Sequence, residues 1–178
     1  MSRYRPPAPR AAPYITAAGF ARLEAELRTL WRETRPEVTR RVSEAAAMGD
    51  RSENAEYIYG KKQLREIDAR VRYLSKRLEA LNVVDRAPSD RARVFFGAWV
   101  DVVDESGRAE RYRLVGPDEI GTAPGYISID APVARALLGK RVGDVVAVES
   151  AGGMRELEVC GVDYELHDRA TGSGGPTV

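Results

Sequence analysis

The chain has 178 residues, enough for one ordinary domain or two small ones. Its 28 lysine and arginine residues nearly balance its 27 aspartate and glutamate residues, giving a formal net charge of +1, so any nucleic-acid binding must come from local patches. A single cysteine excludes an internal disulfide bond, and a single histidine argues against a zinc site of the usual cysteine and histidine type.

Both ends of the chain are predicted to be disordered. Residues 1–13 combine three arginines with four prolines and lack the apolar run of a secretory signal. Residues 169–178 are rich in glycine, as solvated tails are. No stretch of about 18 apolar residues occurs, so we expect no membrane association and a cytoplasmic location.

Residues 14–85 are predicted to form an antiparallel coiled-coil hairpin, two long helices joined by a tight turn. Charged residues, leucine and alanine predominate here, and turn formers gather only at Pro36 and at Gly49-Asp50. In the second helix, apolar residues are spaced alternately three and four apart, which is the seam that a coiled coil buries. This seam contains Tyr57, Gly60, Leu64, Ile67, Val71, Leu74, Leu78 and Leu81.

The seam of the first helix changes phase near Pro36. Before the proline it follows the same spacing, but after it the apolar residues resume one position late: Phe20, Leu23, Leu27 and Leu30, then Val38, Val42 and Ala45. A proline removes a backbone donor and clashes with the preceding turn, so we predict a kink or short break there, with the helix continuing beyond it. An arm of about 34 residues would reach roughly 50 Å.

Such long arms also suit self-association as a coiled-coil dimer, and the seam residues alone do not separate the two arrangements. The tight turn at Met48-Gly49-Asp50 favours a hairpin within one chain. We therefore expect a monomer.

Residues 86–168 are predicted to form a small α+β domain after a linker at Pro88-Ser89. A short helix is predicted from Pro132 to Gly139, because proline stands in its first turn and glycine at its end. Runs of β-forming residues are separated by glycine, proline and aspartate turns. They cover residues 93–103, 111–115, 126–129, 145–149 and 157–162.

The predicted hairpin tip, residues 49–57, carries two carboxylates with two interpretations. Asp50 and Glu53 match a capping box at a helix start, which on residues alone is the simpler explanation. Alternatively, residues three apart project to one side, where two carboxylates could share a divalent ion. Magnesium prefers oxygen ligands, but an isolated pair would bind it weakly, so such a site would need ligands from elsewhere.

Basic residues recur along the second helix outside the seam. A solvated charged face explains them, particularly because Glu66, Asp68 and Glu79 are interspersed. The functional alternative is a face that holds the phosphates of a single strand, with Tyr59 available to stack on a base. The basic residues are Lys61, Lys62, Arg65, Arg70, Arg72, Lys76 and Arg77.

Longer motifs run through both regions. In the hairpin they are Leu30-Trp31-Arg32-Glu33, Arg35-Pro36-Glu37-Val38 and the tip at residues 49–57. In the second domain they include residues 94–100, 127–132 and 142–144. Their length and order resemble the bacterial Gre transcript-cleavage factors over roughly residues 14–164, and Arg51-Ser52 resembles the GreB-like branch of that family.

The resemblance implies a coiled coil that enters the secondary channel of RNA polymerase and an FKBP-like domain, residues 86–168, that docks at the channel mouth. Asp50 and Glu53 match the tip acids that stabilise a Mg²⁺ ion and the attacking water, so that polymerase cleaves the extruded RNA 3′ end of a backtracked complex. The chain would be an accessory factor without catalysis of its own, and it would hold no Mg²⁺ stably when free.

The resemblance also assigns further residues. Lys61 and Lys62 match the basic side of the tip, and with Arg65 they are the candidate RNA-binding residues. Asp130 and Pro132 fall in the loop that resembles the polymerase-docking surface. A channel inhibitor on the same scaffold would dock without stimulating cleavage, but the intact acids argue against it. Residues 45–48 carry no basic side chain, so next to the turn the first helix contributes no residue to a basic face.

Overall fold

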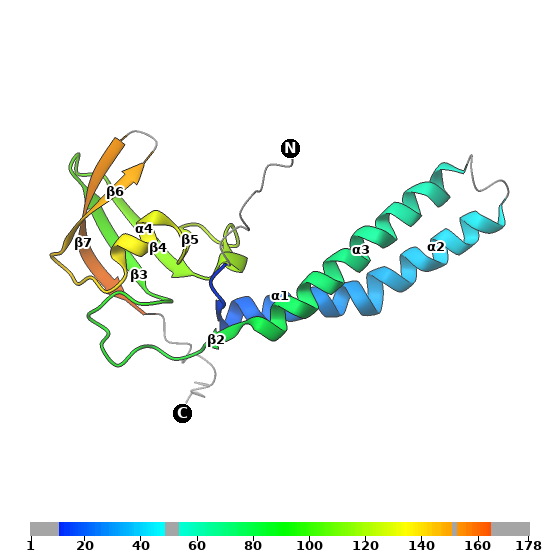
Figure 1. Cartoon of the computed structure of the whole chain (residues 1–178), viewed down its shortest axis with the longest axis horizontal. Helices are drawn as coiled ribbons and strands as arrows, with labels where there is room; N and C mark the ends of the chain where they lie inside the picture. Colours follow the sequence, from blue (N-terminus) through cyan, green and yellow to red (C-terminus); the bar gives the residue numbers. More distant parts are fainter. Residues whose placement is uncertain (1–10, 49–53, 151–152, 165–178) are drawn as a thin grey trace, which may run out of the picture. The chain divides into compact units, whose positions relative to one another are not determined.

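The computed structural model describes residues 11–48, 54–150 and 153–164. The chain divides into a helical unit, Ala17–Asn82, and a sheet unit that combines the chain up to Thr16 with the chain from Val83 onward. The predicted α+β class is confirmed, with a helical hairpin first and a strand-rich domain after it (Figure 1). Apart from residues 11–13, the predicted disordered ends at 1–13 and 169–178 lie outside the described residues.

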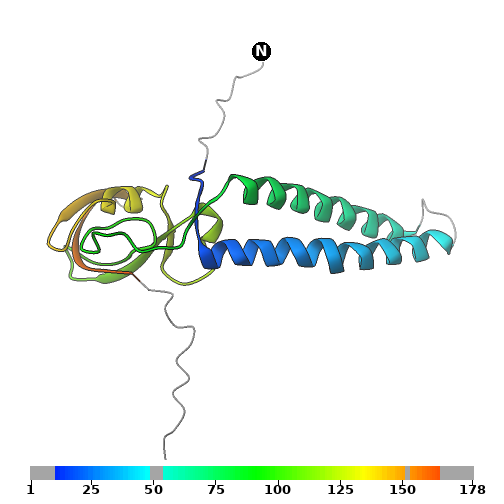
Figure 2. The same cartoon turned by 90° about the horizontal axis from the view of Figure 1, so that it is seen from below.

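The helical unit is a hairpin of one composite helix and one simple helix. The first arm runs through α1 (Ala17–Thr29), the π-helical segment η1 (Leu30–Thr34) and α2 (Arg35–Ala47), and α3 (Ala55–Ala80) returns beside it (Figure 2). At about 1.5 Å per residue, α3 is roughly 40 Å long. Over the part of the chain that the structure describes, no helix is both long enough and apolar enough to cross a membrane.

The hairpin was predicted to span residues 14–85. In the structure, a short strand lies at each end of this range. Tyr14–Thr16 forms β1 and Asn82–Val84 forms β2, and these two strands pair in a small sheet of their own. Helix α1 therefore starts at Ala17 and α3 ends at Ala80.

A π-helical turn absorbs the phase change of the first seam. The N–H of Arg35 donates to the carbonyl of Leu30, five residues earlier, where an α-helix would bond four residues earlier. The wider turn holds one additional residue, which is the delay seen between Leu30 and Val38. Pro36 lies in the first turn of α2, and its ring would clash with the preceding turn of a regular helix, so the widening relieves that clash. The predicted disturbance is thus a π turn in a helix that continues.

The two seams form the core of the hairpin because the π turn keeps them on one side. Val38, Val42 and Ile67 are buried together, while Leu64 and Val71 pack against them. Leu23 and Leu74 extend the buried row toward the other end of the hairpin. Full burial of such a side chain contributes about 1.5–3 kcal/mol, so this row accounts for most of the adhesion between the arms.

Two ion pairs cross between the arms on either side of the π turn. Arg70 donates two hydrogen bonds to Glu26, at 2.6 and 2.9 Å, and Arg35 donates to Asp68 at 2.8 Å. The Arg70 hydrogen bond lowers the pKa of Glu26 below its ordinary value. Pairs as exposed as these contribute about 0–1 kcal/mol each, so they act chiefly on the register of the helices.

The sheet unit is built on five strands in the order β5-β4-β3-β7-β6. Strands β4 and β5 pair in parallel, and the other neighbouring strands in this order are antiparallel. The strands are β3 (Trp99–Asp104), β4 (Ala109–Val115), β5 (Tyr126–Ser128), β6 (Val145–Ser150) and β7 (Gly153–Asp163).

The core of the sheet unit lies on one face of this sheet. Alternate residues of β3, Val100 and Val102, are buried together with Leu114 and Leu157. The short helix α4 (Pro132–Leu137) contributes Ala134 and Leu137 to the same core. The alternation of buried and exposed positions along β3 is the expected pattern of a sheet covered on one face.

The predicted strand at residues 93–103 is wrong for its first six residues, since β3 begins at Trp99. Val94 is fully buried, which explains the strand-like pattern, but the chain turns between Phe95 and Ala98. Gly97 has a φ of 84°, a conformation that favours glycine and interrupts an extended strand. The strands β4 and β7 also begin earlier than predicted, at Ala109 and Gly153.

A buried carboxylate fastens β1 to the sheet unit. Glu119, in the 3₁₀ turn η2 (Pro117–Glu119), is 2% exposed and accepts hydrogen bonds from the N–H groups of Thr16 and Gly116 and from the Thr16 hydroxyl. Gly116 has no room for a side chain, because a Cβ atom there would overlap the carbonyl oxygen of Tyr14. The residue before α1 is therefore held by a charge-assisted network.

A polar network also orders the turn between β3 and β4. Asp104 Oδ1 accepts from the Ser106 hydroxyl at 2.6 Å and from the N–H groups of Ser106 and Arg108, both at 2.9 Å. Arg155 donates to Asp104 at 2.9 Å and to Glu110 at 3.1 Å, joining β7 to this turn. The Ser106 hydrogen bond, followed by that of Arg108, lowers the pKa of Asp104 to about 2.

This network predicts a specific sensitivity to acid. Because the pKa of Asp104 is lower in the folded state, its contribution to stability is fully present above about pH 4 and is lost as the pH falls from about 4 to about 2. The substitution Ser106→Ala should raise the pKa of Asp104 and move acid unfolding to a higher pH. NMR titration of the Asp104 carboxyl and melting curves between pH 2 and 6 measure both. Ser89→Ala, in an exposed linker, is the control, and an unchanged Asp104 titration in Ser106→Ala would contradict the assignment.

Candidate functional site

The side chain of Asn54 links the described ends of α2 and α3 at the hairpin tip. It is the N-cap of α3, and its Oδ1 accepts from the N–H of Tyr57 at 3.1 Å. Its Nδ2 donates to the carbonyl of Ala45 at 2.9 Å, close to the end of α2. One amide thus satisfies an unpaired N–H at the start of one helix and a carbonyl at the end of the other, which fixes the two helix ends against each other.

The predicted capping box is wrong, because Asn54 and not Asp50 holds the N-cap position of α3. Asn54 matches the family's tip motif, but it was not predicted as the N-cap, although asparagine is among the preferred N-cap residues, because Asp50-x-x-Glu53 matched the capping-box pattern better. Asp50 and Glu53 themselves lie outside the described residues. Among the residues that are described, no group of three or more histidine, cysteine, aspartate or glutamate side chains could hold a metal ion.

The predicted RNA-binding residues all lie on the exposed surface of α3, in its first half. Lys61 and Arg65 share one side of the helix, where Arg65 Nε donates to the Lys61 carbonyl at 3.3 Å. The Lys61 ammonium lies 6.0 Å from the centre of the Tyr57 ring. Lys62 points elsewhere and pairs with Glu66 at 3.9 Å. The structure therefore places Lys61 and Arg65 on one side of α3, in the two turns that follow Tyr57.

The two arms pack closely at Gly60. A Cβ atom built on this residue would overlap Cγ2 of Val42 on α2, while the next atoms, Val42 Cβ and Cα, are 3.7 and 4.0 Å away. Gly60 is buried, and glycine costs about 1 kcal/mol relative to alanine inside a helix. The position of Gly60 in the seam was predicted; its close contact with Val42 was not.

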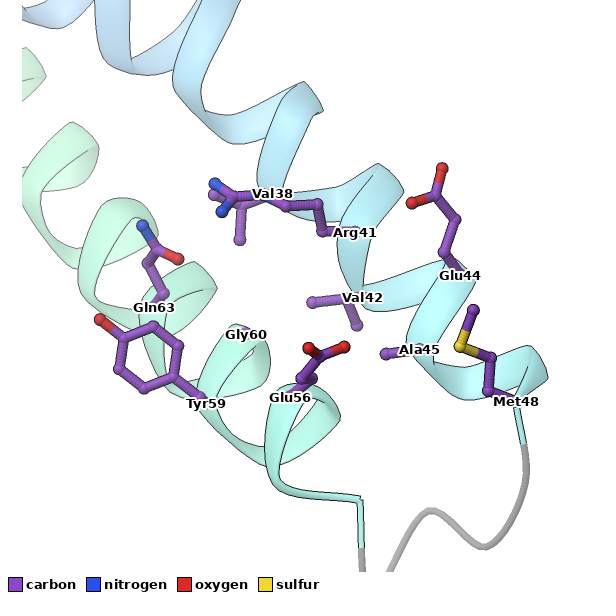
Figure 3. Close-up of a pocket in the computed structure, with 10 residues that line it drawn as sticks. All are labelled: Val38, Arg41, Val42, Glu44, Ala45, Met48, Glu56, Tyr59, Gly60 and Gln63. Carbon is purple, nitrogen blue, oxygen red and sulfur yellow. The ribbon is translucent and has the colours of Figure 1, made fainter.

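A cavity of about 430 Å³ opens between α2 and α3 beside this contact. We call it the tip cavity; Val38, Val42, Ala45 and Gly60 form its apolar part. Figure 3 shows Glu56 projecting from α3 into the space between the helices, and the Arg41 side chain extending from α2 toward Gln63. The remaining lining residues are Glu44, Met48 and Tyr59. Sequence reasoning missed this cavity, because its lining comes from two segments whose pairing depends on the register of the hairpin.

The predicted docking residues lie in the loop between β5 and α4. Pro132 is exposed in the first turn of α4, as predicted for a helix start. The N–H of Asp130 donates to the Ser128 hydroxyl at 3.1 Å, and its carboxylate accepts from the N–H of Ala12 at 2.9 Å. The loop is thus held by its neighbours, while one face of Pro132 stays open.

The fold defines a class, namely two-unit proteins that combine a helical hairpin with a strand-rich unit. Residues 13–83 match the family model described as transcription elongation factor, N-terminal, and residues 88–164 match the C-terminal model of the GreA/GreB transcription elongation factors. The chain belongs to the GreA/GreB family of transcription elongation factors, and its general role lies in transcription elongation.

Two relatives named transcription elongation factor GreB agree with this membership. The chain is 58% identical over 164 residues to transcription elongation factor GreB of Pseudomonas aeruginosa, covering 92% of this chain and 98% of that protein. It is 60% identical over 165 residues to transcription elongation factor GreB of Xanthomonas axonopodis, covering 92% and 98%. Among solved structures, GreA factor homolog 1 of Thermus thermophilus is 28% identical, with a TM-score of 0.39 over 86% of this chain and 99% of that one.

The Gly60 contact predicts a sign reversal between two backgrounds. In the unaltered chain, Gly60→Ala should destabilise the hairpin by about 1–3 kcal/mol through overpacking against Val42. After Val42→Ala, the atom that clashes is gone, and Gly60→Ala should stabilise by up to about 1 kcal/mol through helix propensity. Urea unfolding followed by circular dichroism gives the four free energies of unfolding in this double-mutant cycle. An equal effect of Gly60→Ala in both backgrounds would rule out the contact as the cause.

Proposed function

We propose that this chain inserts its helical hairpin into the secondary channel of RNA polymerase and stimulates the Mg²⁺-dependent cleavage of backtracked RNA by the polymerase. Its partners are the polymerase and the nascent RNA 3′ end, and it acts as a monomer. It is an accessory factor that completes the active site of another enzyme and thereby rescues arrested complexes. The family membership supports the role in elongation; the features of the tip support the mechanism.

The observation that carries this proposal is the position of the N-cap. Capping was the simplest structural explanation for Asp50 and Glu53, and Asn54 fills that position instead. The positive end of the helix dipole favours carboxylates before a helix start, but it does not require this particular pair of acids, so a further reason for Asp50 and Glu53 can be sought in a partner. Delivery of carboxylates to a cationic centre on a partner is such a reason.

The chemistry of the two acids fits Mg²⁺. Aspartate and glutamate supply the hard oxygen ligands that this ion prefers, and one or two carboxylates with further ligands from elsewhere is its usual binding mode in phosphoryl transfer. Bound Mg²⁺ would lower the pKa of a coordinated water and neutralise charge on the phosphate. Asp50 and Glu53 would hold the ion from the side of the factor, and Lys61 and Arg65 would hold phosphates of the extruded RNA.

Docking is assigned to the loop with Asp130 and Pro132. The Ala12 N–H uses one oxygen of the Asp130 carboxylate, and an ionised carboxylate can accept about four hydrogen bonds, so Asp130 can also receive donors from polymerase. Pro132 offers an exposed, rigid apolar contact beside it. We also propose that the domain of residues 86–168, which contains this loop, is FKBP-like.

Neutralising the tip acids tests the mechanism. Asp50→Asn and Glu53→Gln should each lower the stimulated cleavage rate roughly 100-fold or more, the cost of losing an electrostatic stabiliser of a transition state. Cleavage is followed in stalled complexes of purified polymerase with Mg²⁺, and polymerase binding should be unchanged.

Asn54→Ala is the matched control, since it should lower the melting temperature of the hairpin while Asp50→Asn leaves it unchanged. Loss of an N-cap costs about 0.5–2 kcal/mol. If wild-type factor leaves RNA cleavage at the rate of polymerase alone, or if Asp50→Asn unfolds the tip as Asn54→Ala does, the proposal is overturned.

Docking is tested separately through affinity. Asp130→Ala should raise the factor concentration needed for half-maximal cleavage roughly tenfold, because hydrogen bonds to charged groups are strong. Cleavage at saturating factor should stay near the wild-type rate, since the tip is intact. Asp85→Ala, which removes an exposed acid in the linker, serves as control. A lower rate at saturation with unchanged affinity would contradict the docking role.

A further inference from the structure

The tip cavity carries uncommitted polar groups from one helix. Glu56, Tyr59 and Gln63 stand three and four residues apart on α3 and line the cavity together (Figure 3). None of their side chains makes a hydrogen bond or ion pair with another described residue. The charged residues from α2 differ, because Arg41 pairs with Glu37 at 3.5 Å and Glu44 pairs with Arg40 at 3.7 Å. The α3 side of the cavity is thus available to a ligand.

The chemistry of these groups selects the class of ligand. The Glu56 carboxylate lies in the space between the helices and disfavours a phosphate beside it, while the charge of Arg41 on the α2 side is paired with Glu37 at 3.5 Å (Figure 3). Tyr59 is 69% exposed and presents an aromatic face, and aromatic faces stack on bases of any sequence. A volume of about 430 Å³ lies within the roughly 300–1,000 Å³ of typical ligand pockets. A planar, uncharged ring with hydrogen-bonding groups fits the charge of the cavity, the aromatic face of Tyr59 and the available volume.

The Glu56 carboxylate narrows the choice among bases. An ionised carboxylate only accepts hydrogen bonds, through two neighbouring oxygens. Guanine alone presents two adjacent donors, N1–H and the N2 amino group, on the edge by which an unpaired base is read. Uracil places carbonyl oxygens on both sides of its single N–H, and adenine and cytosine place a ring acceptor beside their amino group. Each of these bases would therefore bring an acceptor lone pair close to the Glu56 carboxylate, which repels it.

We propose that the tip cavity binds a guanine base of the RNA, stacked on Tyr59 and hydrogen-bonded to Glu56, with the Gln63 amide available to the carbonyl of the base. This inference rests on the proposed function, which brings single-stranded RNA to the hairpin tip. Lys61 and Arg65 would act on the phosphates, while the tip cavity would act on the base and make the response of the factor dependent on the RNA sequence.

Binding is tested first without polymerase, on the full chain with ¹³C-labelled methionine methyl groups. Met48 lies at the rim of the tip cavity and is 81% exposed, whereas Met154, in the sheet unit and 68% exposed, is an internal control. Guanosine should shift the Met48 signal and leave the Met154 signal in place, and uridine and cytidine should shift neither. Tyr59→Ala and Glu56→Gln should each weaken guanosine binding roughly tenfold, while Glu79→Gln, an exposed acid farther along α3, should not.

The second measurement uses backtracked complexes whose extruded RNA segment carries guanosine or uridine. Half-maximal cleavage should need less factor with guanosine, and Glu56→Gln should abolish that difference while the rate at saturation stays unchanged. A Met48 signal unmoved by guanosine, or moved equally by every nucleoside, overturns the inference. Weaker polymerase binding by Glu56→Gln with both RNAs also overturns it, since the occupant would then be a polymerase side chain. Failure of the proposed function is distinct: cleavage is not stimulated, but guanosine still shifts Met48.

Discussion

Close packing of α2 against α3 is the constraint on which the rest of the helical unit depends. At Gly60 the helices approach so closely that a single methyl group would overlap Val42. The approach requires both seams to face each other over the length of the arms, yet the first seam changes phase before Pro36. The π turn at Leu30–Thr34 restores the phase by holding one additional residue, so that Leu30 and Val38 lie in one core.

This packing determines what the tip can do. Because the helices are in register, the Asn54 side chain reaches the Ala45 carbonyl and joins the two helix ends. The same register places polar groups of α3 opposite the apolar residues of α2 and leaves the tip cavity between them. The candidate site is therefore a consequence of helix register, and a change at Gly60 or in the π turn would act on the tip from a distance.

In the sheet unit, irregular chain segments are held by charge-assisted hydrogen bonds, whereas the helical unit is held by close packing of its helices. Buried Glu119 secures Thr16, and Asp104 organises the turn between β3 and β4 with Ser106 and Arg155. Neither network follows from a sequence pattern, because each joins residues far apart in the chain or in turns without periodicity. The loop with Asp130 and Pro132 is held in the same way, which presents both residues on an ordered surface.

The sequence by itself determined the class of fold, the hairpin with its seam, the place of the disturbance near Pro36 and the short helix after Pro132, because periodicity and proline geometry are local properties. It also marked Lys61 and Arg65 among the basic residues outside the seam of the second helix. Only the tertiary structure decided that Asn54 caps α3, that a π turn replaces a break, that β3 starts at Trp99 and that a cavity lies beside Gly60. These features depend on which segments meet in space, and segments meet through packing and register, which local patterns do not encode.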